Sequence, residues 1–229
     1  MRLIPHFHGQ TRNGRPADLR QDRGVPYRLQ PVTGASIGEA PPPCVDCVFW
    51  QTRPNRTTDK QRWAHRIEDD WGAWGTLYVA EDERLLGFVQ FGPEEFFQRA
   101  RTLPAGPPSA DAVLITCAYL VDASTPWVMQ SLFLSVIGEA RDRGVKAIET
   151  FGYRYPEGES AYERFFVHRT IFPSDFLADF GFTPVRWSGQ VALARLELGG
   201  LQPVEEGAPA RVLRHVKEAF TPAPVPQRP

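Results

Sequence analysis

Residues 111–151 read DAVLITCAYLVDASTPWVMQSLFLSVIGEARDRGVKAIETF, and the hydrophobic pattern changes twice along them. Residues 111–121 are almost continuously apolar, which is typical of a strand at the centre of a sheet. Residues 126–143 repeat apolar side chains at helical spacing, and residues 145–151 are again β-prone. The stretch therefore predicts a strand, a helix and a second strand, which together form a β-α-β unit.

The helix of this unit carries a start signal and a stop signal. Thr125 can cap it, Pro126 suits the first helical position, and Gly144 can end it. The apolar repeat along one side consists of Val128, Leu132, Val136 and Ala140. This helix is the best marked in the sequence.

A helix and a hairpin are predicted upstream of this unit. Asp59 can cap a helix over 59–72, and Gly72 can end it. Residues 76–80 and 85–91 are β-prone runs separated by a polar turn, a pattern typical of a hairpin. The remaining predicted elements are a short helix at 94–101, a second one from Ser174 or Asp175 to Phe180 that ends at Gly181, and strands at 183–187 and 191–198. Together the elements predict a mixed α/β domain, in which helices flank a central, mostly antiparallel sheet with one β-α-β unit.

Composition divides the 229 residues into three parts. Residues 1–43 are rich in proline and arginine and predict an N-terminal arm, with a β-prone run at 27–32. Residues 44–200 are expected to form the folded domain. Residues 201–229 predict a proline-rich tail, in which 210–220 has the spacing of a short docking helix.

Charge and hydropathy exclude several classes of protein. Lys plus Arg total 26 against 27 for Asp plus Glu, so no basic excess favours nucleic acid. The longest apolar run, residues 117–121, is far shorter than the roughly 18 residues that a membrane span needs. The N-terminus has no apolar secretory core, and three cysteines do not make a disulfide framework. We therefore expect a cytoplasmic protein without nucleic-acid or membrane partners.

Cys44 and Cys47 have the spacing of half a zinc site or of a redox pair. Structural zinc usually needs two such pairs, and the remaining ligands are Cys117 and scattered histidines, of which His6 and His8 form the one close pair. The cysteine pair does not open a helix after a strand, as a thioredoxin-like motif would. Reduced thiols without a metal are therefore the expectation.

Four segments, taken in their order along the chain, resemble the GNAT superfamily of acyl-CoA-dependent N-acyltransferases. Residues 178–185 (ADFGFTPV) are similar to the family's short helix followed by Gly-Phe and a strand. Residues 140–144 (ARDRG) are similar to the end of its central helix. Residues 44–50 (CVDCVFW) and 109–114 (SADAVL) resemble an actinobacterial GNAT-like subgroup. The resemblance covers about residues 44–198 and implies a GNAT-like fold.

The resemblance implies transfer of an acetyl group from acetyl-CoA to an amine of a small molecule or a protein. In the family, the central strand binds the pantetheine arm, and the loop before the next helix binds the pyrophosphate through backbone N–H groups. Carried over to this chain, the strand positions are Cys117, Tyr119 and Val121, and the loop positions are Ser124, Thr125, Trp127, Val128, Met129 and Gln130.

The loop departs from the family pattern Q/R-x-x-G-x-G/A. Its two glycine positions fall on Trp127 and Met129, its first position falls on Ser124, and Pro126 removes one N–H group. The family tyrosine that protonates the leaving thiolate corresponds to Leu177. Either Trp127 and Met129 turn into the core and a shifted loop retains a phosphate site, or the acetyl-CoA site has degenerated.

Glu149 and Tyr153 are the candidate catalytic residues. Glu149 is a lone acid in an apolar strand, where burial would suit a general base, and a salt-bridged or edge position is the alternative. Tyr153 is the candidate acid, with Tyr155 and Tyr162 in the same aromatic stretch as substitutes. Packing on the domain surface is the alternative role of these tyrosines. Asp111 suits a turn or a cap better than a base.

Two functions remain open at the level of the sequence. The first is an N-acetyltransferase that uses acetyl-CoA, with Glu149 as base and Tyr153 as acid. The second is a GNAT-fold protein that no longer binds acetyl-CoA and acts as a ligand- or protein-binding module. The expected partners are an amine substrate and either a protein partner or a second copy of the chain.

Overall fold

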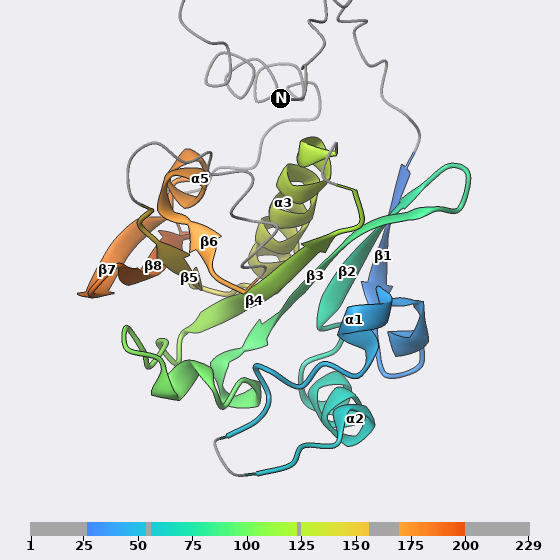
Figure 1. Ribbon diagram of the computed structural model, residues 1–229, viewed down its shortest axis with the longest axis horizontal. Coiled ribbons are helices and arrows are strands. Elements are labelled where there is room, and N and C mark those ends of the chain that lie inside the picture. The colour runs from blue at the N-terminus through green and yellow to red at the C-terminus, as the bar shows by residue number, and fades with distance from the viewer. Residues whose placement is uncertain (1–26, 54–55, 123–124, 156–169, 200–229) are drawn as a thin grey trace, which may run out of the picture.

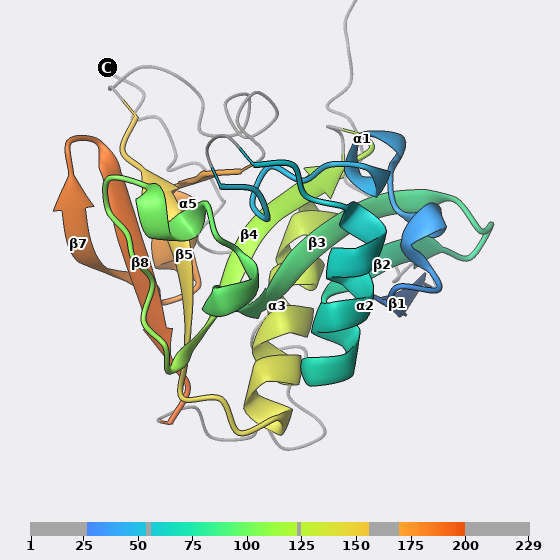
Figure 2. The same ribbon diagram turned by 90° about the horizontal axis from the view of Figure 1, so that it is seen from below.

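The described part of the chain forms an eight-stranded sheet with helices on both faces (Figures 1 and 2). In this computed structural model, residues 27–53, 56–122, 125–155 and 170–199 are described. Across the sheet the strands follow the order β1 (Tyr27–Val32), β2 (Gly75–Ala80), β3 (Leu85–Pro93), β4 (Ala112–Leu120), β5 (Ala147–Tyr153), β8 (Val191–Glu197) and β7 (Thr183–Ser188). An additional short strand, β6 (Phe172–Pro173), pairs with β5.

The centre of the sheet contains the predicted β-α-β unit. Strands β4 and β5 are parallel, and helix α3 (Pro126–Asp142) connects them. β6 is also parallel to β5, whereas the other neighbouring strands are antiparallel. The predicted fold class, a mixed α/β domain with a mostly antiparallel sheet, is confirmed.

The remaining helical segments are short, apart from α2. They are α1 (Pro42–Val45), α2 (Lys60–Asp70), α5 (Ser174–Asp179) and the 3-10 turns η1 (Ile37–Glu39), η2 (Glu94–Phe96) and η3 (Ala100–Thr102). The single helix predicted at 94–101 is therefore wrong. Phe97 N donates to Glu94 O and Ala100 N donates to Phe97 O, both at 3.0 Å, which is the three-residue spacing of 3-10 turns.

The predicted helix signals are present at α2 and are only partly present at α3. Asp59 caps α2, because its Oδ1 accepts a hydrogen bond from Arg62 N at 3.0 Å. Gly72 follows α2 with a φ of 104°, in the left-handed region that suits glycine. The cap predicted for Thr125 is wrong: its hydroxyl donates to Asp122 O at 2.7 Å and caps no N–H group of α3.

Hydrophobic side chains pack against both faces of the sheet. On one face, α3 contributes Val128, Leu132 and Phe133 to a core that also contains side chains of α5 and its neighbours. On the opposite face, α2 contributes Trp63 and Ile67, which pack with further tryptophans of the preceding and following segments. The helices thus hold the two sides of the β4–β5 junction in place.

The segment predicted as an N-terminal arm contributes β1 to one edge of the sheet. β1 pairs antiparallel with β2, from Tyr27 opposite Ala80 to Val32 opposite Gly75. The helix predicted at 210–220 lies outside the described residues. Among the described residues, no helix has the length and apolar character needed to cross a membrane.

Candidate functional site

The parallel strands β4 and β5 separate halfway along their length. Their pairing runs from Ala112 opposite Ala147 to Ile115 opposite Thr150, and then stops. β4 continues to Leu120 beside β3, while β5 continues beside β8. The result is a splay between the two central strands, at the place where the resemblance puts the pantetheine arm.

A β-bulge in β4 marks the start of the splay. Gln90 lies opposite Cys117 and the next residue of β3, Phe91, lies opposite Ile115, so Thr116 is the extra residue. The Thr116 hydroxyl donates to Gln90 O at 3.1 Å, which ties the bulge to β3. A bulge bends its strand, which agrees with the end of the pairing between β4 and β5 after Ile115.

The edge of β4 in the splay can be assigned from the pairing with β3. Val121 N donates to Leu86 O at 2.9 Å, and antiparallel pairs alternate between bonded and non-bonded. Ala118 and Leu120 therefore direct their backbone groups toward the splay. These two residues are only 1% and 2% exposed, so the splay is covered along this edge.

β6 occupies the opposite side of the splay. Gly152 pairs with Ala192 of β8 on one edge of β5 and with Phe172 of β6 on the other. Since β8 takes the outer edge, β6 must lie on the edge that faces β4, as Figure 1 shows. Phe172 is fully buried, and its ring meets Phe133 of α3 edge-on at 5.0 Å between centroids.

The start of α3 offers few free donors for a pyrophosphate. Thr125 N donates to Asp122 O at 3.3 Å, and Val128 N donates to Thr125 O at 3.1 Å. Pro126 has no N–H group. Of the N–H groups at residues 125–128, only that of Trp127 has no backbone acceptor among the described residues. Ser124 lies outside the described residues.

The two residues at the family's glycine positions point in different directions. Met129 is 3% exposed and belongs to the core between α3 and the sheet. Trp127 is 45% exposed, so its indole lies on the surface at the mouth of the loop. The alternative that both turn into the core is wrong for Trp127 and right for Met129.

The other predicted cofactor positions are spread over both sides of the sheet. Val128 is fully buried in the α3 core and Gln130 is half-buried on the same helix. Tyr119 and Cys117 are half-buried on the α2 side. Val121 is 53% exposed just after β4. The predicted positions that the structure describes therefore differ widely in their exposure.

Glu149 lies in an ion-pair network, in the paired part of β5 opposite Leu114. It is fully buried, and Ser109 donates to its carboxylate from both N and Oγ at 2.7 Å. Arg195 Nη1 of β8 donates to it at 3.1 Å. Arg195 also pairs with Asp111 at 3.0 Å and Glu197 at 2.6 Å. These contacts place Glu149 as the anchor of loop 103–109 and match the salt-bridged alternative.

Tyr153 lies at the end of β5, on the side of β8. Its hydroxyl donates to Gln190 Oε1, and its ring meets Tyr155 edge-on at 4.8 Å between centroids. Leu177, at the family's tyrosine position on α5, is 1% exposed and packs in the core. Tyr162 lies outside the described residues.

A buried polar cluster, which sequence reasoning missed, lies against the bulge on the α2 side. Gln90 Oε1 accepts from Lys60 Nζ at 3.1 Å and from Gln51 Nε2 at 2.9 Å. Gln90 Nε2 donates to Thr116 Oγ1 at 2.9 Å. All four residues are less than a tenth exposed. The cluster links the start of α2 to the bulge in β4.

Burial changes the protonation of this cluster. Desolvation lowers the pKa of Lys60 to about 8, although the nearby thiols of Cys117, Cys47 and Cys44 oppose the shift. The Lys60 amine lies 4.4 Å from the ring centroid of Trp63. Burial, followed by the field of Cys44, raises the pKa of Cys117 to about 12. The amine is thus neutral in part near pH 8, while the thiol stays protonated.

The three cysteines do not combine into a metal centre. All three are free, and no group of at least three His, Cys, Asp or Glu side chains in the described ranges could hold a metal ion. Cys47 is exposed and Cys44 is half-buried beside Cys117.

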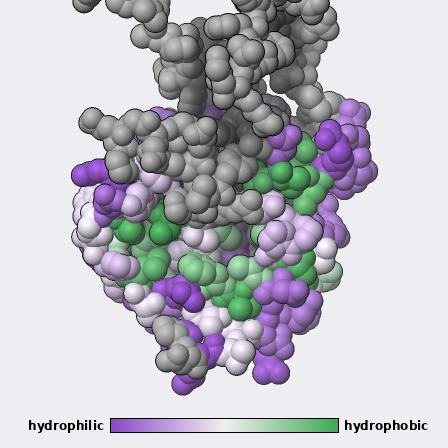
Figure 3. All heavy atoms as spheres, viewed as in Figure 1, coloured by the Kyte–Doolittle hydropathy of each residue, from purple (hydrophilic) through white to green (hydrophobic). Residues whose placement is uncertain are grey.

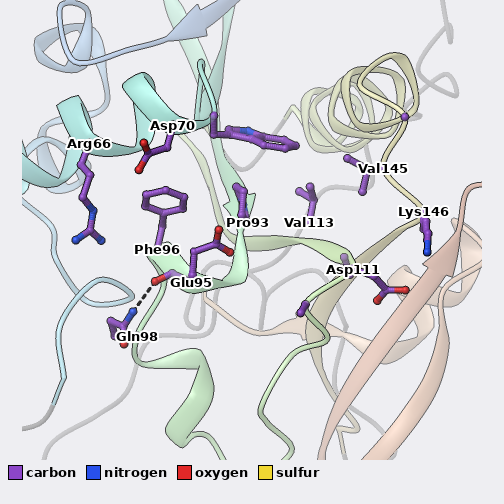
Figure 4. Close-up of a pocket in the computed structure, with 14 residues that line it drawn as sticks. Arg66, Asp70, Pro93, Glu95, Phe96, Gln98, Asp111, Val113, Val145 and Lys146 are labelled. Carbon is purple, nitrogen blue, oxygen red and sulfur yellow. Dashed lines mark hydrogen bonds between the residues drawn. The ribbon is translucent and has the colours of Figure 1, made fainter.

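Two cavities flank η2 on the α2 side of the sheet. The larger, of about 810 Å³, runs from Arg66 to the start of β4 and carries mixed charges. Figure 4 shows Arg66 at one end, Asp111 and Lys146 at the other, and Phe96 between them. The smaller, of about 450 Å³, lies in front of the start of α2. Gln51 and Trp63 line the smaller cavity, so it adjoins the buried polar cluster.

No family model and no curated protein sequence matches the chain. Solved structures that are similar to it include Ard1 from Thermoplasma volcanium, with 10% identity, a TM-score of 0.44 and coverage of 77% of this chain and 99% of that one. A GNAT-family acetyltransferase from Listeria monocytogenes has 13% identity, a TM-score of 0.44 and coverage of 75% and 95%. The PaiA N-acetyltransferase from Thermoplasma acidophilum, in complex with coenzyme A, has 11% identity, a TM-score of 0.43 and coverage of 75% and 99%. At these identities the likeness concerns the fold alone. The description of the sheet rests on its own strand order and pairing.

Proposed function

We propose that this chain is a ligand-binding protein built on an N-acyltransferase fold, and that its central cleft does not bind acyl-CoA. The observation that carries this proposal is the position of β6. A pantetheine arm pairs with the central strand from inside the splay, and here β6 pairs with β5 inside the same splay. The buried edge at Ala118 and Leu120 supports this conclusion, because a ligand would have to displace core side chains to reach it.

The start of α3 supports the same conclusion. A pyrophosphate needs several convergent N–H donors, and each charge-assisted hydrogen bond contributes about 1.5–3 kcal/mol. Thr125 and Val128 already use their N–H groups within the loop, and Pro126 has none. The exposed indole of Trp127 then occupies the approach that a bare glycine backbone would leave open.

The groups proposed for proton transfer are also engaged elsewhere. Glu149 accepts hydrogen bonds from Ser109 and Arg195, so both of its carboxylate oxygens already have partners within the fold. Leu177 supplies no acid at the position of the family tyrosine. A binding function needs neither a base nor an acid and agrees with this arrangement.

Hydrogen exchange with acetyl-CoA tests the proposal, because it locates any binding along the chain. At about millimolar acetyl-CoA, a ligand held in the cleft would slow exchange in peptides from the end of β4 and the start of α3. We expect unchanged exchange in both. Slower exchange there would show that the cleft binds the cofactor and would overturn the proposal.

The second candidate is the N-acetyltransferase that the resemblance implies, with Glu149 and Tyr153 as its proposed base and acid. The observation in its favour is the amine of Lys60, whose pKa burial lowers to about 8. A partly neutral amine beside the β4 bulge could accept a proton from an acceptor amine. The same exchange experiment decides between the two candidates.

A further inference from the structure

We propose that the cavity in front of α2 binds a small organic anion through Arg56, Arg62 and Arg66. The proposal deepens the binding function by naming a ligand class, and it concerns a different part of the molecule from the splay. The cavity has a volume of about 450 Å³, within the range of small-molecule sites. It lies between the segment before α2, the first turns of α2 and the η2 region.

The lining of this cavity is strongly cationic. Arginines at 53, 56, 62 and 66 line it together with one acid, Asp59. The carboxylate of Asp59 accepts from Arg62 N as the cap of α2, so it is already committed to the helix. The outer surface over α2 is hydrophilic in Figure 3. Four guanidinium groups against one carboxylate give the lining a net positive charge.

Two of these arginines contact uncharged side chains. Arg53 donates from Nε and Nη2 to Gln98 Oε1, at 2.9 and 2.5 Å, so a neutral side chain orients it. Arg66 lies over the ring of Phe96, 5.3 Å from its centroid. Within the described residues, no carboxylate forms an ion pair with Arg56, Arg62 or Arg66.

Converging guanidinium groups favour an anion for a simple electrostatic reason. Like charges gathered around a partly enclosed space repel one another, and an anion between them replaces repulsion with attraction. Arginine also presents a planar fork that binds carboxylate or phosphate through two parallel hydrogen bonds. The start of α2 adds the positive end of its dipole to the same field.

The rest of the lining fits a small organic body better than a bare ion. Trp63 and Phe96 supply aromatic surface beside the arginines, and Gln51 and Thr58 supply neutral hydrogen-bonding groups. By contrast, the adjoining cavity of about 810 Å³ combines Arg66 and Lys146 with three acids. The charge asymmetry is confined to the smaller cavity, which is why we assign the anion to it.

Thermal unfolding of the full chain with two probe anions tests the assignment at constant ionic strength. Pyrophosphate represents a phosphate ligand and tricarballylate a carboxylate ligand. We expect at least one of them to raise the melting temperature at millimolar concentration. In the double variant Arg62→Gln/Arg66→Gln, the apparent affinity should fall by at least about tenfold.

Arg141→Gln is the matched control, because Arg141 is an exposed helical arginine on α3, away from the cavity. It should keep the full response to the probes. The proposal is overturned if neither probe shifts the wild-type transition, or if the double variant responds as the wild type does. Neither result would bear on the central cleft. The hydrogen-exchange experiment with acetyl-CoA tests that cleft separately, in peptides from the end of β4 and the start of α3.

Discussion

At the scale of single residues, Glu149 shows how a candidate base can serve as an anchor. It is fully buried, and its hydrogen bonds join β5 to Ser109 of the loop before β4 and to Arg195 of β8. A buried carboxylate of this kind is costly to leave unpaired, and its partners are equally costly to leave without it. Its position therefore holds the loop against the sheet.

Replacing Glu149 should destabilise the protein much more than replacing Glu197, an exposed acid that pairs with the same arginine. We expect Glu149→Ala to lower the free energy of unfolding by about 3–5 kcal/mol, since Ser109 N and Arg195 lose a buried acceptor. Glu197 pairs with the same arginine but its side chain is 68% exposed, so Glu197→Ala should cost less than about 1 kcal/mol. Urea unfolding of both variants measures the difference, and equal costs would refute the anchoring role.

Lys60 is a second residue whose surroundings change its chemistry, because burial lowers the pKa of its amine. It is 8% exposed, and its pKa is lowered from 10.5 to about 8 by burial. Between these two values the unfolded chain holds a proton on Lys60 that the folded chain has released. Stability therefore rises with pH from about 8.

We expect the free energy of unfolding to increase by about 1 kcal/mol between pH 8 and 9. Above pH 9, Cys117 opposes this rise, because its raised pKa of about 12 keeps it protonated in the folded state after it has ionised in the unfolded one. Lys60→Met should remove the rise, whereas Lys146→Met, at an exposed position, should retain it. Urea unfolding across this pH range is the measurement, and a slope that survives in Lys60→Met would refute the assignment.

At the scale of elements, the start of α3 separates surface from core within three residues. Trp127 is 45% exposed, whereas Met129 is 3% exposed and packs between α3 and the sheet. The resemblance places glycines at both positions, and the two side chains have different surroundings here. Trp127 lies on the surface, and Met129 belongs to the core.

Substitutions at these two positions should therefore differ in cost. We expect Met129→Ala to lower the free energy of unfolding by about 2–5 kcal/mol, because it leaves a cavity in the core. Trp127→Ala should change it by less than about 1 kcal/mol, because the indole is largely in solvent. Chemical denaturation of the two variants provides the comparison, and a larger cost at Trp127 would contradict the orientation of its side chain.

The elements also show which parts of the fold can be predicted from sequence. β4, α3 and β5 are predictable because hydrophobic period and chain breakers act locally. β6 is not, because two residues at 172–173 carry no periodic signal and owe their strand to pairing with a distant β5. The same holds for Glu149, whose partners come from loop 103–109 and from β8.

The arginine cavity illustrates the same limit at the site. The arginines at 53, 56, 62 and 66 lie close together in the sequence, and their density was a visible signal. Their convergence depends on η2, which follows about thirty residues later and brings Phe96 and Gln98 beneath them. A local pattern can indicate positive charge, but only the packing of α2 against η2 gives it a cavity.

At the scale of the whole molecule, the features that bear on the proposed function lie on two sides of one sheet. The strand order, the splay after Ile115 and the bulge at Thr116 are present. The space within the splay is taken by β6, and the positive cavity lies on the other side, at the start of α2. We therefore propose that ligand binding belongs to the α2 side and that the central cleft holds no acyl-CoA.

The most direct test is a calorimetric titration of acetyl-CoA into the Arg62→Gln/Arg66→Gln double variant. This variant lacks two of the three arginines that we propose to bind an anion, and it leaves the central cleft untouched. The account predicts no saturable heat at millimolar acetyl-CoA. A saturable isotherm with one site per chain would show that acetyl-CoA binds without Arg62 and Arg66, and it would contradict our proposal.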